Sequence, residues 1–104
     1  DKYNVTLVLK GHQTVVMNEE KFYINKTGNP GMATAGDGDV LTGMMAAFLG
    51  QTYSPFEAAQ AGVYLHGLAG DLAAQEMGEI SMIATDILNK LPMAFLTYRE
   101  NTSI

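Results

Sequence analysis

The chain has 104 residues, of which 47% are hydrophobic, enough for the core of one small domain. Its net charge of −5, with six lysine and arginine residues in all, excludes the basic stripe that nucleic-acid binding requires. The absence of cysteine excludes disulfides and thiolate metal sites, and no apolar run approaches the roughly 20 residues that span a bilayer, so we expect a cytoplasmic protein without nucleic-acid or membrane partners.

Three segments in the first quarter of the chain are typical of β-strands. Residues 5–9 form a continuous apolar and β-branched run, which predicts a strand buried on both faces of a sheet. Residues 14–17 and 22–24 are shorter runs, joined by polar residues 18–21 as in a solvent-exposed hairpin. Because the first strand would have edges that need partners, we expect a missing N-terminal part of a larger fold to supply the rest of the sheet.

The segment 29–49 carries most of the functional information. Gly36 and Gly38 keep side chains away from the backbone just before an apolar helical run that starts at Asp39 and that Gly50 can end in a left-handed cap. Free N–H groups should therefore converge on a helix N-terminus, a geometry that attracts anions. Asp39 is placed where a base can take a proton from a hydroxyl about to receive a phosphoryl group.

A second helix is predicted by a strong local signature. Ser54 is suited to the N-cap, Pro55 to the first helical position, and Glu57 completes a capping box. We expect this helix to run to about Met77 and to stop at Gly78.

Glycines at positions 62, 67 and 70 lie inside this second helix. Each lowers helix propensity, so we expect a neighbouring element to pack closely against that face. A third helix should follow, capped by residue 85 or 86, with a break or kink imposed by Pro92. Strands followed by helices, with a glycine-rich loop leading into a helix, indicate an α/β fold.

Four segments together resemble a known family. They are L-K-G-H-Q-T at 9–14, T-G-N-P-G-M-A-T at 27–34, G-D-G-D-V-L-T-G at 36–43 and H-G-L-A-G-D at 66–71. In this order they resemble the ADP/ATP-dependent NAD(P)H-hydrate dehydratases of the ribokinase-like superfamily, and N-P-G-M-A-T is far more specific than G-x-G-D alone. The resemblance implies a ribokinase-like three-layer α/β/α fold, with residues 1–104 as the C-terminal part of a single domain, in the order strand, β-hairpin, helices.

The resemblance also implies a metabolite-repair reaction. The family's enzymes use a nucleotide, usually ADP in bacteria, to phosphorylate the ring hydroxyl of the S epimer of hydrated NADH or NADPH. Loss of phosphate then regenerates NAD(P)H, with AMP as the other product and Mg²⁺ assisting. No set of magnesium ligands is visible in this sequence, so the metal would depend on the missing part or on nucleotide oxygens and water. The family further suggests a homo-oligomer, such as a tetramer.

The same resemblance assigns roles to individual residues. Asp39 matches the catalytic base and contacts the hydrate, and Asn29 is a further expected substrate contact. Backbone N–H groups of residues 36–38 would stabilise the transferring phosphoryl group, which places Gly36, Asp37 and Gly38 in the catalytic turn. The residues matched to the adenine nucleotide are Lys10, Gly11, His12, Gln13, Thr14 and Gly38.

Asp37 departs from the family pattern, which usually has serine or threonine at this position. A carboxylate in an anion-binding turn repels phosphate unless its side chain points away. Our interpretation is that the turn uses only the backbone N–H of Asp37 and that the side chain faces solvent. The alternative is that Asp37 interferes with phosphate binding.

The remaining polar residues have less specific interpretations. Lys10 is either a solvated charge at a strand end or a phosphate ligand, and His12 is expected to be polar surface. His66 is expected to be a satisfied buried or interface histidine without a partner for a metal pair, and Asp71 to be structural.

Two other functional hypotheses remain open at this point. The chain can belong to an ordinary small-molecule kinase, for example of a vitamin precursor, because the G-x-G-D turn is shared across the superfamily. It can also be a fragment that is inert until it docks on its N-terminal portion, a hypothesis that is compatible with the first.

Overall fold

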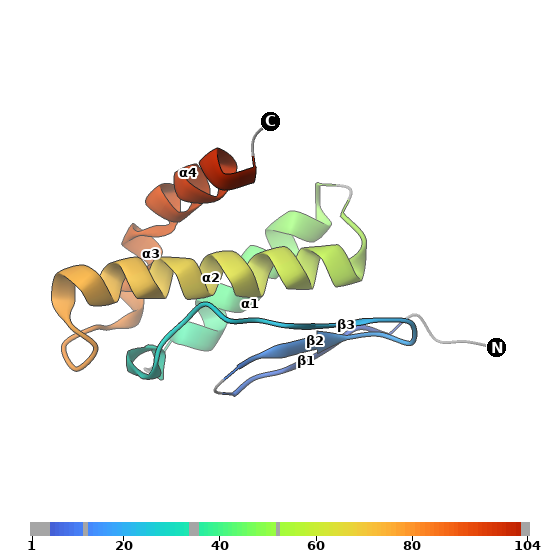
Figure 1. Cartoon of the computed structure of the whole chain (residues 1–104), viewed down its shortest axis with the longest axis horizontal. Coiled ribbons are helices and arrows are strands. Elements are labelled where there is room, and N and C mark those ends of the chain that lie inside the picture. Colours follow the sequence, from blue (N-terminus) through green and yellow to red (C-terminus); the bar gives the residue numbers. More distant parts are fainter. Residues whose placement is uncertain (1–4, 12, 34–35, 52, 103–104) are drawn as a thin grey trace.

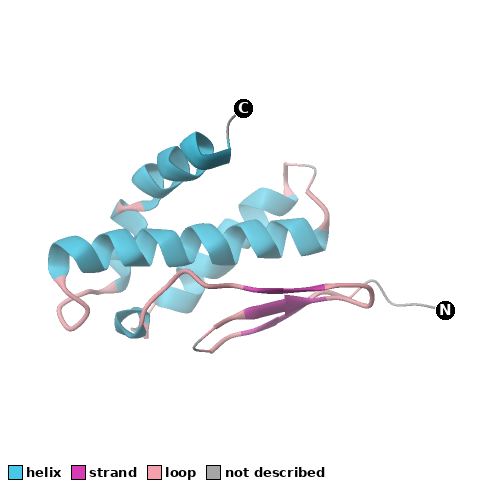
Figure 2. Cartoon of the chain, viewed as in Figure 1, coloured by secondary structure: helices cyan, strands magenta, loops and turns pink. Residues whose placement is uncertain are grey.

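The computed structural model of the protein describes residues 5–11, 13–33, 36–51 and 53–102. The elements in chain order are β1 (Leu7–Leu9), β2 (Val15–Met17), β3 (Phe22–Ile24), the 3-10 turn η1 (Pro30–Met32), α1 (Asp37–Leu49), α2 (Pro55–Met77), α3 (Ala84–Asn89) and α4 (Leu91–Thr102). The sheet forms one layer, and the helices lie on one side of it, with α2 crossing the middle of the molecule (Figures 1 and 2).

The three strands form an antiparallel sheet in the order β1-β2-β3. Asn18 fixes the turn between β2 and β3, because its side-chain oxygen accepts hydrogen bonds from the backbone N–H groups of Glu20 and Lys21, each at 2.9 Å. The predicted hairpin is therefore confirmed. Its polar turn residues closed the loop locally, which is why the sequence was sufficient to place it.

The prediction that the first strand is buried on both faces is wrong for the described chain. Leu7 and Leu9 are 50% and 54% exposed. The strand also starts two residues later than expected, at Leu7. A sheet with helices on one face only buries alternate residues, so Val8 packs inward while its neighbours face outward.

The inner face of the sheet packs on the helices through β2. Val16 is fully buried, with Val8 and Tyr23 beside it on the neighbouring strands. The helical side of this cluster consists of Leu41 from α1 and Phe56, Ala59 and Val63 from α2. The alternation of strand side chains is thus what attaches the sheet to the helical layer.

The start of α2 agrees with its prediction. The Ser54 hydroxyl accepts a hydrogen bond from the Glu57 N–H at 3.2 Å, and the Glu57 carboxylate accepts one from the Ser54 N–H at 3.1 Å. Pro55 occupies the first helical position. The helix ends at Gly78, whose φ of 80° is readily adopted by glycine. Both ends of this helix were therefore encoded locally.

The glycines inside α2 allow close packing, as expected. A Cβ atom on Gly67 would overlap the side chain and the backbone of Thr27, and one on Gly70 would overlap the Met32 side chain. A Cβ atom on Gly62 would lie 2.7 Å from Cγ of Met45. The loop after β3 and helix α1 thus approach α2 at positions where it carries no side chain.

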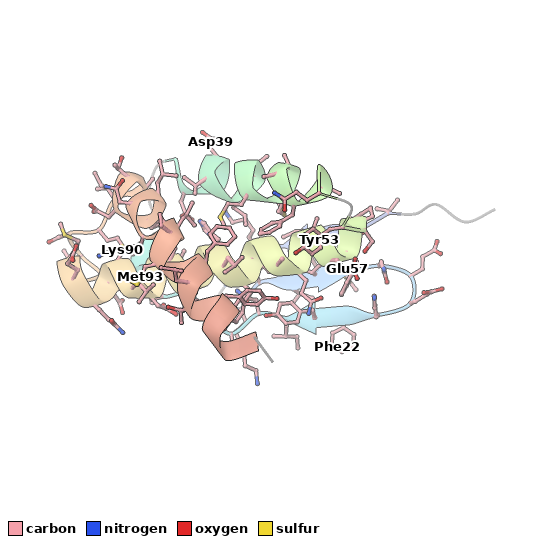
Figure 3. All side chains as sticks on the ribbon, turned by 90° about the horizontal axis from the view of Figure 1, so that it is seen from above. Phe22, Asp39, Tyr53, Glu57, Lys90 and Met93 are labelled. Atoms are coloured by element: carbon pink, nitrogen blue, oxygen red, sulfur yellow. The ribbon has the colours of Figure 1, made fainter. Side chains whose placement is uncertain are left out.

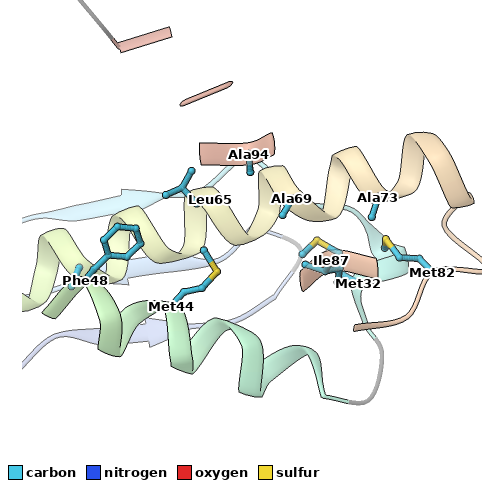
Figure 4. Close-up of a cluster of buried hydrophobic side chains, with 10 residues drawn as sticks. Met32, Met44, Phe48, Leu65, Ala69, Ala73, Met82, Ile87 and Ala94 are labelled. Atoms are coloured by element: carbon cyan, nitrogen blue, oxygen red, sulfur yellow. The ribbon is translucent and has the colours of Figure 1, made fainter. Parts of the chain in front are cut away.

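A second hydrophobic cluster joins the four helices. Figure 4 shows Met44 and Phe48 of α1 beside Leu65 of α2. The buried members of this cluster are Met32, Met44, Phe48, Ala58, Leu65, Ala69, Ala73, Met82, Ile87 and Ala94. Three of them are methionines, whose flexible side chains can fill irregular gaps in a core.

Several predicted helix boundaries differ from those observed. Helix α1 begins at Asp37 rather than Asp39, and Gly50 has φ −71°, so the predicted left-handed cap is wrong. Helix α3 begins at Ala84, where the Asp86 carboxylate accepts a hydrogen bond from the Ile83 N–H at 2.9 Å.

The chain breaks between α3 and α4 at Lys90, just before Pro92. Pro92 lies in the first turn of α4, a helix that the sequence analysis did not predict. Proline is compatible with this position because the first N–H groups of a helix have no intrahelical acceptor.

No helix of the described part of the chain is both long enough and apolar enough to span a bilayer.

The Gly67→Ala variant tests the close approach of the loop to α2. We expect it to lower the free energy of unfolding by about 2 kcal/mol, because the added methyl group meets the Thr27 backbone, which cannot move like a flexible side chain. Gly43→Ala in α1 is the matched control: nothing lies within 4 Å of its Cβ position, so it should raise stability by about 0.5–1 kcal/mol. Urea unfolding measures both, and equal effects would contradict the packing argument.

Candidate functional site

A cavity of about 650 Å³ opens between the sheet, the loop after β3, the first turn of α1 and the middle of α2. It is lined by Lys10, Gly11, Thr14, Asn25, Thr27, Gly28, Asn29, Pro30, Met32, Ala33, Asp37, Leu41, Val63, His66 and Gly67. All four segments that carry the family resemblance contribute to this wall: segments 9–14 and 27–34 supply three or more residues each, and segments 36–43 and 66–71 supply two each. The tertiary structure thus gathers segments that are distant in sequence around one space.

The first turn of α1 presents free hydrogen-bond donors. Gly36 precedes the helix with φ 86° and provides no side-chain cap. The first helical hydrogen bond that the described residues form runs from the Val40 N–H to the Gly36 carbonyl, at 3.2 Å. Among the described residues, the N–H groups of positions 37–39 have no acceptor. N–H groups at a helix N-terminus that lack an intrahelical acceptor are the groups that attract anions.

Lys10 brings a positive charge to the same place. A Cβ atom on Gly38 would lie 3.5 Å from the Lys10 ammonium nitrogen, so the ammonium reaches the first turn of α1. Lys10 itself directly follows β1 and is exposed. An ammonium beside unpaired N–H groups at the positive end of a helix dipole is the arrangement that holds a phosphate.

Asp37 does not face solvent, and the interpretation that it does is wrong. Its carboxylate oxygen lies 2.7 Å from Nε2 of His66, and the two residues are only 7% and 6% exposed. The reason is the earlier start of α1, which places Asp37 on the buried stripe of that helix with Leu41 and Met44. The spacing of Asp37, Leu41 and Met44 along one helix face is visible in the sequence, but the predicted start of the helix at Asp39 left Asp37 outside it.

His66 is buried, as expected, and its partner is a carboxylate that the sequence analysis did not connect with it. Burial lowers the pKa of the His66 imidazole because it disfavours the charged form. The Asp37 carboxylate acts in the opposite direction, and the nearby Lys10 ammonium lowers the pKa further. The net direction is downward, so the neutral imidazole is favoured.

Asp39 lies apart from this pair. It is exposed, and Figure 3 shows it directed away from the rest of the molecule. It does not line the cavity, although it shares the first turn of α1 with the free N–H groups. The two carboxylates of that turn therefore diverge, with Asp37 turned toward α2 and Asp39 toward solvent.

Asn29 and Asp71 hold the loop that forms the cavity rim. The Asn29 side-chain amide donates to the Asp71 carboxylate at 2.9 Å, and its oxygen accepts a hydrogen bond from the Gly31 N–H at 3.0 Å. The second Asp71 oxygen accepts one from the Gly28 N–H at 3.0 Å. Asp71 is therefore structural, as expected, whereas Asn29 uses both ends of its side chain within the protein.

The segment 10–14, predicted to bind the nucleotide, lies partly along the cavity wall. Gly11 and Thr14 line the cavity beside Lys10, whereas Gln13 is exposed and does not line it. His12 lies outside the described residues.

Within the described residues, no group of three or more histidine, aspartate or glutamate side chains is placed to hold a metal ion. The side chains of this part of the chain therefore do not form an all-protein metal cage.

The fold matches solved structures of the ribokinase-like class. A ribokinase-like superfamily protein from Enterococcus faecalis V583 superposes with a TM-score of 0.78 and 40% identity, over 91% of this chain and 33% of that one. An ADP/ATP-dependent NAD(P)H-hydrate dehydratase from Bacillus subtilis, co-crystallised with ATP and Mg²⁺, gives a TM-score of 0.83 and 34% identity, over 89% of this chain and 34% of that one.

The NAD(P)H-hydrate dehydratase family model matches residues 1–93, and the chain belongs to this family. A bifunctional NAD(P)H-hydrate repair enzyme from Moorella thermoacetica is 49% identical over 95% of this chain and 19% of its own length. An ADP-dependent (S)-NAD(P)H-hydrate dehydratase from Neisseria meningitidis is 47% identical over 73% of this chain and 26% of its own. The chain thus spans about a fifth to a quarter of the length of these relatives.

The lowered pKa of His66 predicts how stability depends on pH. An unfolded histidine takes up a proton as the pH falls through about 6.5, whereas the folded protein takes it up only at lower pH. The unfolded state therefore binds more protons in this window, and the free energy of unfolding should fall as the pH drops from about 7 toward 5. Urea unfolding at each pH should show a smaller fall for His66→Gln, and an equal fall in both proteins would contradict the assignment.

Proposed function

We propose that this chain carries the phosphate-handling part of a nucleotide-dependent NAD(P)H-hydrate dehydratase. The observation that carries the proposal is that the Lys10 ammonium lies beside the N–H groups at the start of α1, which have no acceptor in the part of the chain that the structure describes. Membership of the dehydratase family supports the assignment of this anion site to a nucleotide.

The proposed chemistry proceeds in two steps. The hydroxyl of hydrated NADH or NADPH attacks the terminal phosphoryl group of ADP or ATP, and loss of phosphate from the product then restores the reduced nicotinamide. Phosphorylation is needed because hydroxide is a poor leaving group, whereas phosphate is a good one. With ADP as donor, the other product is AMP.

Asp39 is the proposed base for the first step. Its carboxylate lies on the turn that carries the free N–H groups, and no described residue forms a hydrogen bond or ion pair with it. It can therefore take the hydroxyl proton while the N–H groups of residues 37–39 stabilise the charge on the transferring phosphoryl group. In this proposal the hydrate lies on the solvent side of the turn, and the nucleotide on the side of Lys10.

The finer parts of the proposal rest on the relatives. The S epimer and ADP correspond to what the Neisseria relative is named for, and ATP with Mg²⁺ to what was co-crystallised with the Bacillus protein. Asn29 is a proposed substrate contact on the loop at the cavity rim, which its side chain also holds in place. We further propose a cytoplasmic protein that assembles as a homo-oligomer.

The Asp39→Asn variant tests the base. Recovery of nicotinamide absorbance from hydrated NADH, with ADP or ATP, measures the rate for the chain mixed with the N-terminal portion of the Moorella relative's dehydratase domain. We expect a loss of about 10²–10⁴-fold, because the amide cannot accept the proton. Glu20→Gln, an equally conservative change in the exposed hairpin turn, should leave the rate unchanged.

Preserved turnover in Asp39→Asn would refute the base assignment. The same mixture also separates the dehydratase from a kinase of the same fold: a dehydratase releases free phosphate and restores absorbance, whereas a kinase accumulates a phosphorylated product.

A second proposal, compatible with the first, is that the chain acts only when its N-terminal portion is docked. The outer face of the sheet carries Leu7, Leu9, Phe22 and Ile24, which are between 42% and 66% exposed. The strand register places them in two apolar rows with Met17 and Val15 between them. We infer that the rest of the three-layer fold covers this face.

The docking proposal predicts that dehydratase activity appears only when the chain is mixed with the N-terminal portion. The chain alone should be inactive, and Leu9→Lys should weaken the recovery because it places a charge in the apolar row. Thr42→Lys on the exposed side of α1 is the matched control and should not affect recovery. An active, monomeric chain that unfolds cooperatively would contradict the docking proposal.

A further inference from the structure

The buried pair of Asp37 and His66 lies in the wall of the cavity that reaches the proposed phosphate site. Asp37 is the first residue of α1, so its carboxylate lies within the turn whose N–H groups face the anion. A negative charge there opposes anion binding and also opposes the contribution of Lys10. The site therefore needs a means of neutralising Asp37 when a phosphoryl group is bound.

His66 is the group that can do this. The charged groups that act on His66 are Asp37 from α1 and Lys10 from the end of β1. The wall segment 27–30, which packs on Gly67 next to His66, contains no titratable side chain. While the imidazole is neutral, Asp37 and Lys10 cancel, and Asp39 adds a negative charge on the solvent side of the same turn. A proton on His66 makes the charge beside the α1 N-terminus more positive by one unit.

We propose that His66 is a positioning residue of the phosphate site, which takes up a proton when an anion binds and thereby neutralises Asp37. The inference rests on the proposed function, because it requires that an anion binds at the start of α1. The proton resides on the imidazole, and the Nε2–H donates to the Asp37 carboxylate, which stays turned toward α2. Anion binding and proton uptake are then linked, so affinity increases as the pH falls.

A purely structural pair is the competing explanation. In that case the contact only fastens α1 to α2, and loss of either partner harms the site in the same way. The linked pair predicts opposite effects. Removing the carboxylate should strengthen anion binding at neutral pH, whereas removing the titratable imidazole should leave Asp37 charged and weaken it.

Sulfate is the probe, because it remains a dianion across the range in which histidine titrates. Binding to the 104-residue chain is followed by nuclear magnetic resonance of backbone amides at about pH 7.5 and about pH 5.5. All proteins carry His12→Gln, since His12 is the second histidine of the chain. We expect sulfate to bind about fivefold more tightly at the lower pH, with the amides of residues 37–39 shifting.

Two variants give the matched comparison. Asp37→Ser, which introduces a residue that the family commonly has here, should bind sulfate more tightly than the parent at the higher pH and show little pH dependence. His66→Gln keeps a side-chain donor for Asp37 and should bind weakly at both pH values. Weaker binding in both variants would overturn the proposal in favour of the structural pair.

The His66 imidazole resonance provides a test that needs neither of these variants. Its pKa should rise when sulfate is added to the His12→Gln protein, because the bound anion favours the protonated ring. An unchanged pKa, or equal sulfate affinity at the two pH values, would overturn the inference and leave the phosphate site standing. No sulfate binding at either pH would refute the phosphate site itself, and the inference with it.

Discussion

The close approach of the loop after β3 to helix α2 is the constraint on which the rest of the structure depends. Thr27 lies directly over Gly67, its hydroxyl donates to the Tyr64 carbonyl at 2.8 Å, and the Asn25 side-chain amide donates to the Val63 carbonyl at 3.0 Å. A side chain on Gly67 would push this loop away, and the cavity wall would move with it. Glycine at position 67 lowers the stability of the helix, but it lets the loop approach closely enough to form the cavity wall.

The same helix places the charges of the site. His66 precedes Gly67 on α2 and reaches across to Asp37 on α1, so one buried contact sets both the packing of two helices and the charge near the free N–H groups. A buried carboxylate and imidazole contribute little stability compared with apolar residues of similar size. Their value lies in the response of the pair to a bound anion, which an apolar contact does not provide.

The two faces of the sheet differ in burial: one packs on the helices and the other is exposed. Val16 is fully buried against the helices, whereas Leu9 and Phe22 on the other face are more than half exposed. The chain covers about a third of the Bacillus and Enterococcus structures it resembles, and its apolar outer face is the surface on which we propose that the rest of the fold docks. The proposed phosphate site lies entirely within this third.

The sequence by itself determined the features that close within a few residues. The Ser54 capping box and the hairpin turn at Asn18 are local features of this kind. The glycine-rich turn before α1 was also located, although the start of the helix was predicted two residues too late. Only the tertiary structure decided that Asp37 meets His66, 29 residues away, that Asp39 points outward, and that the first strand has one exposed face. The reason is that hydrogen bonds within one turn depend on neighbouring residue types, whereas burial and charge pairing depend on which elements pack together.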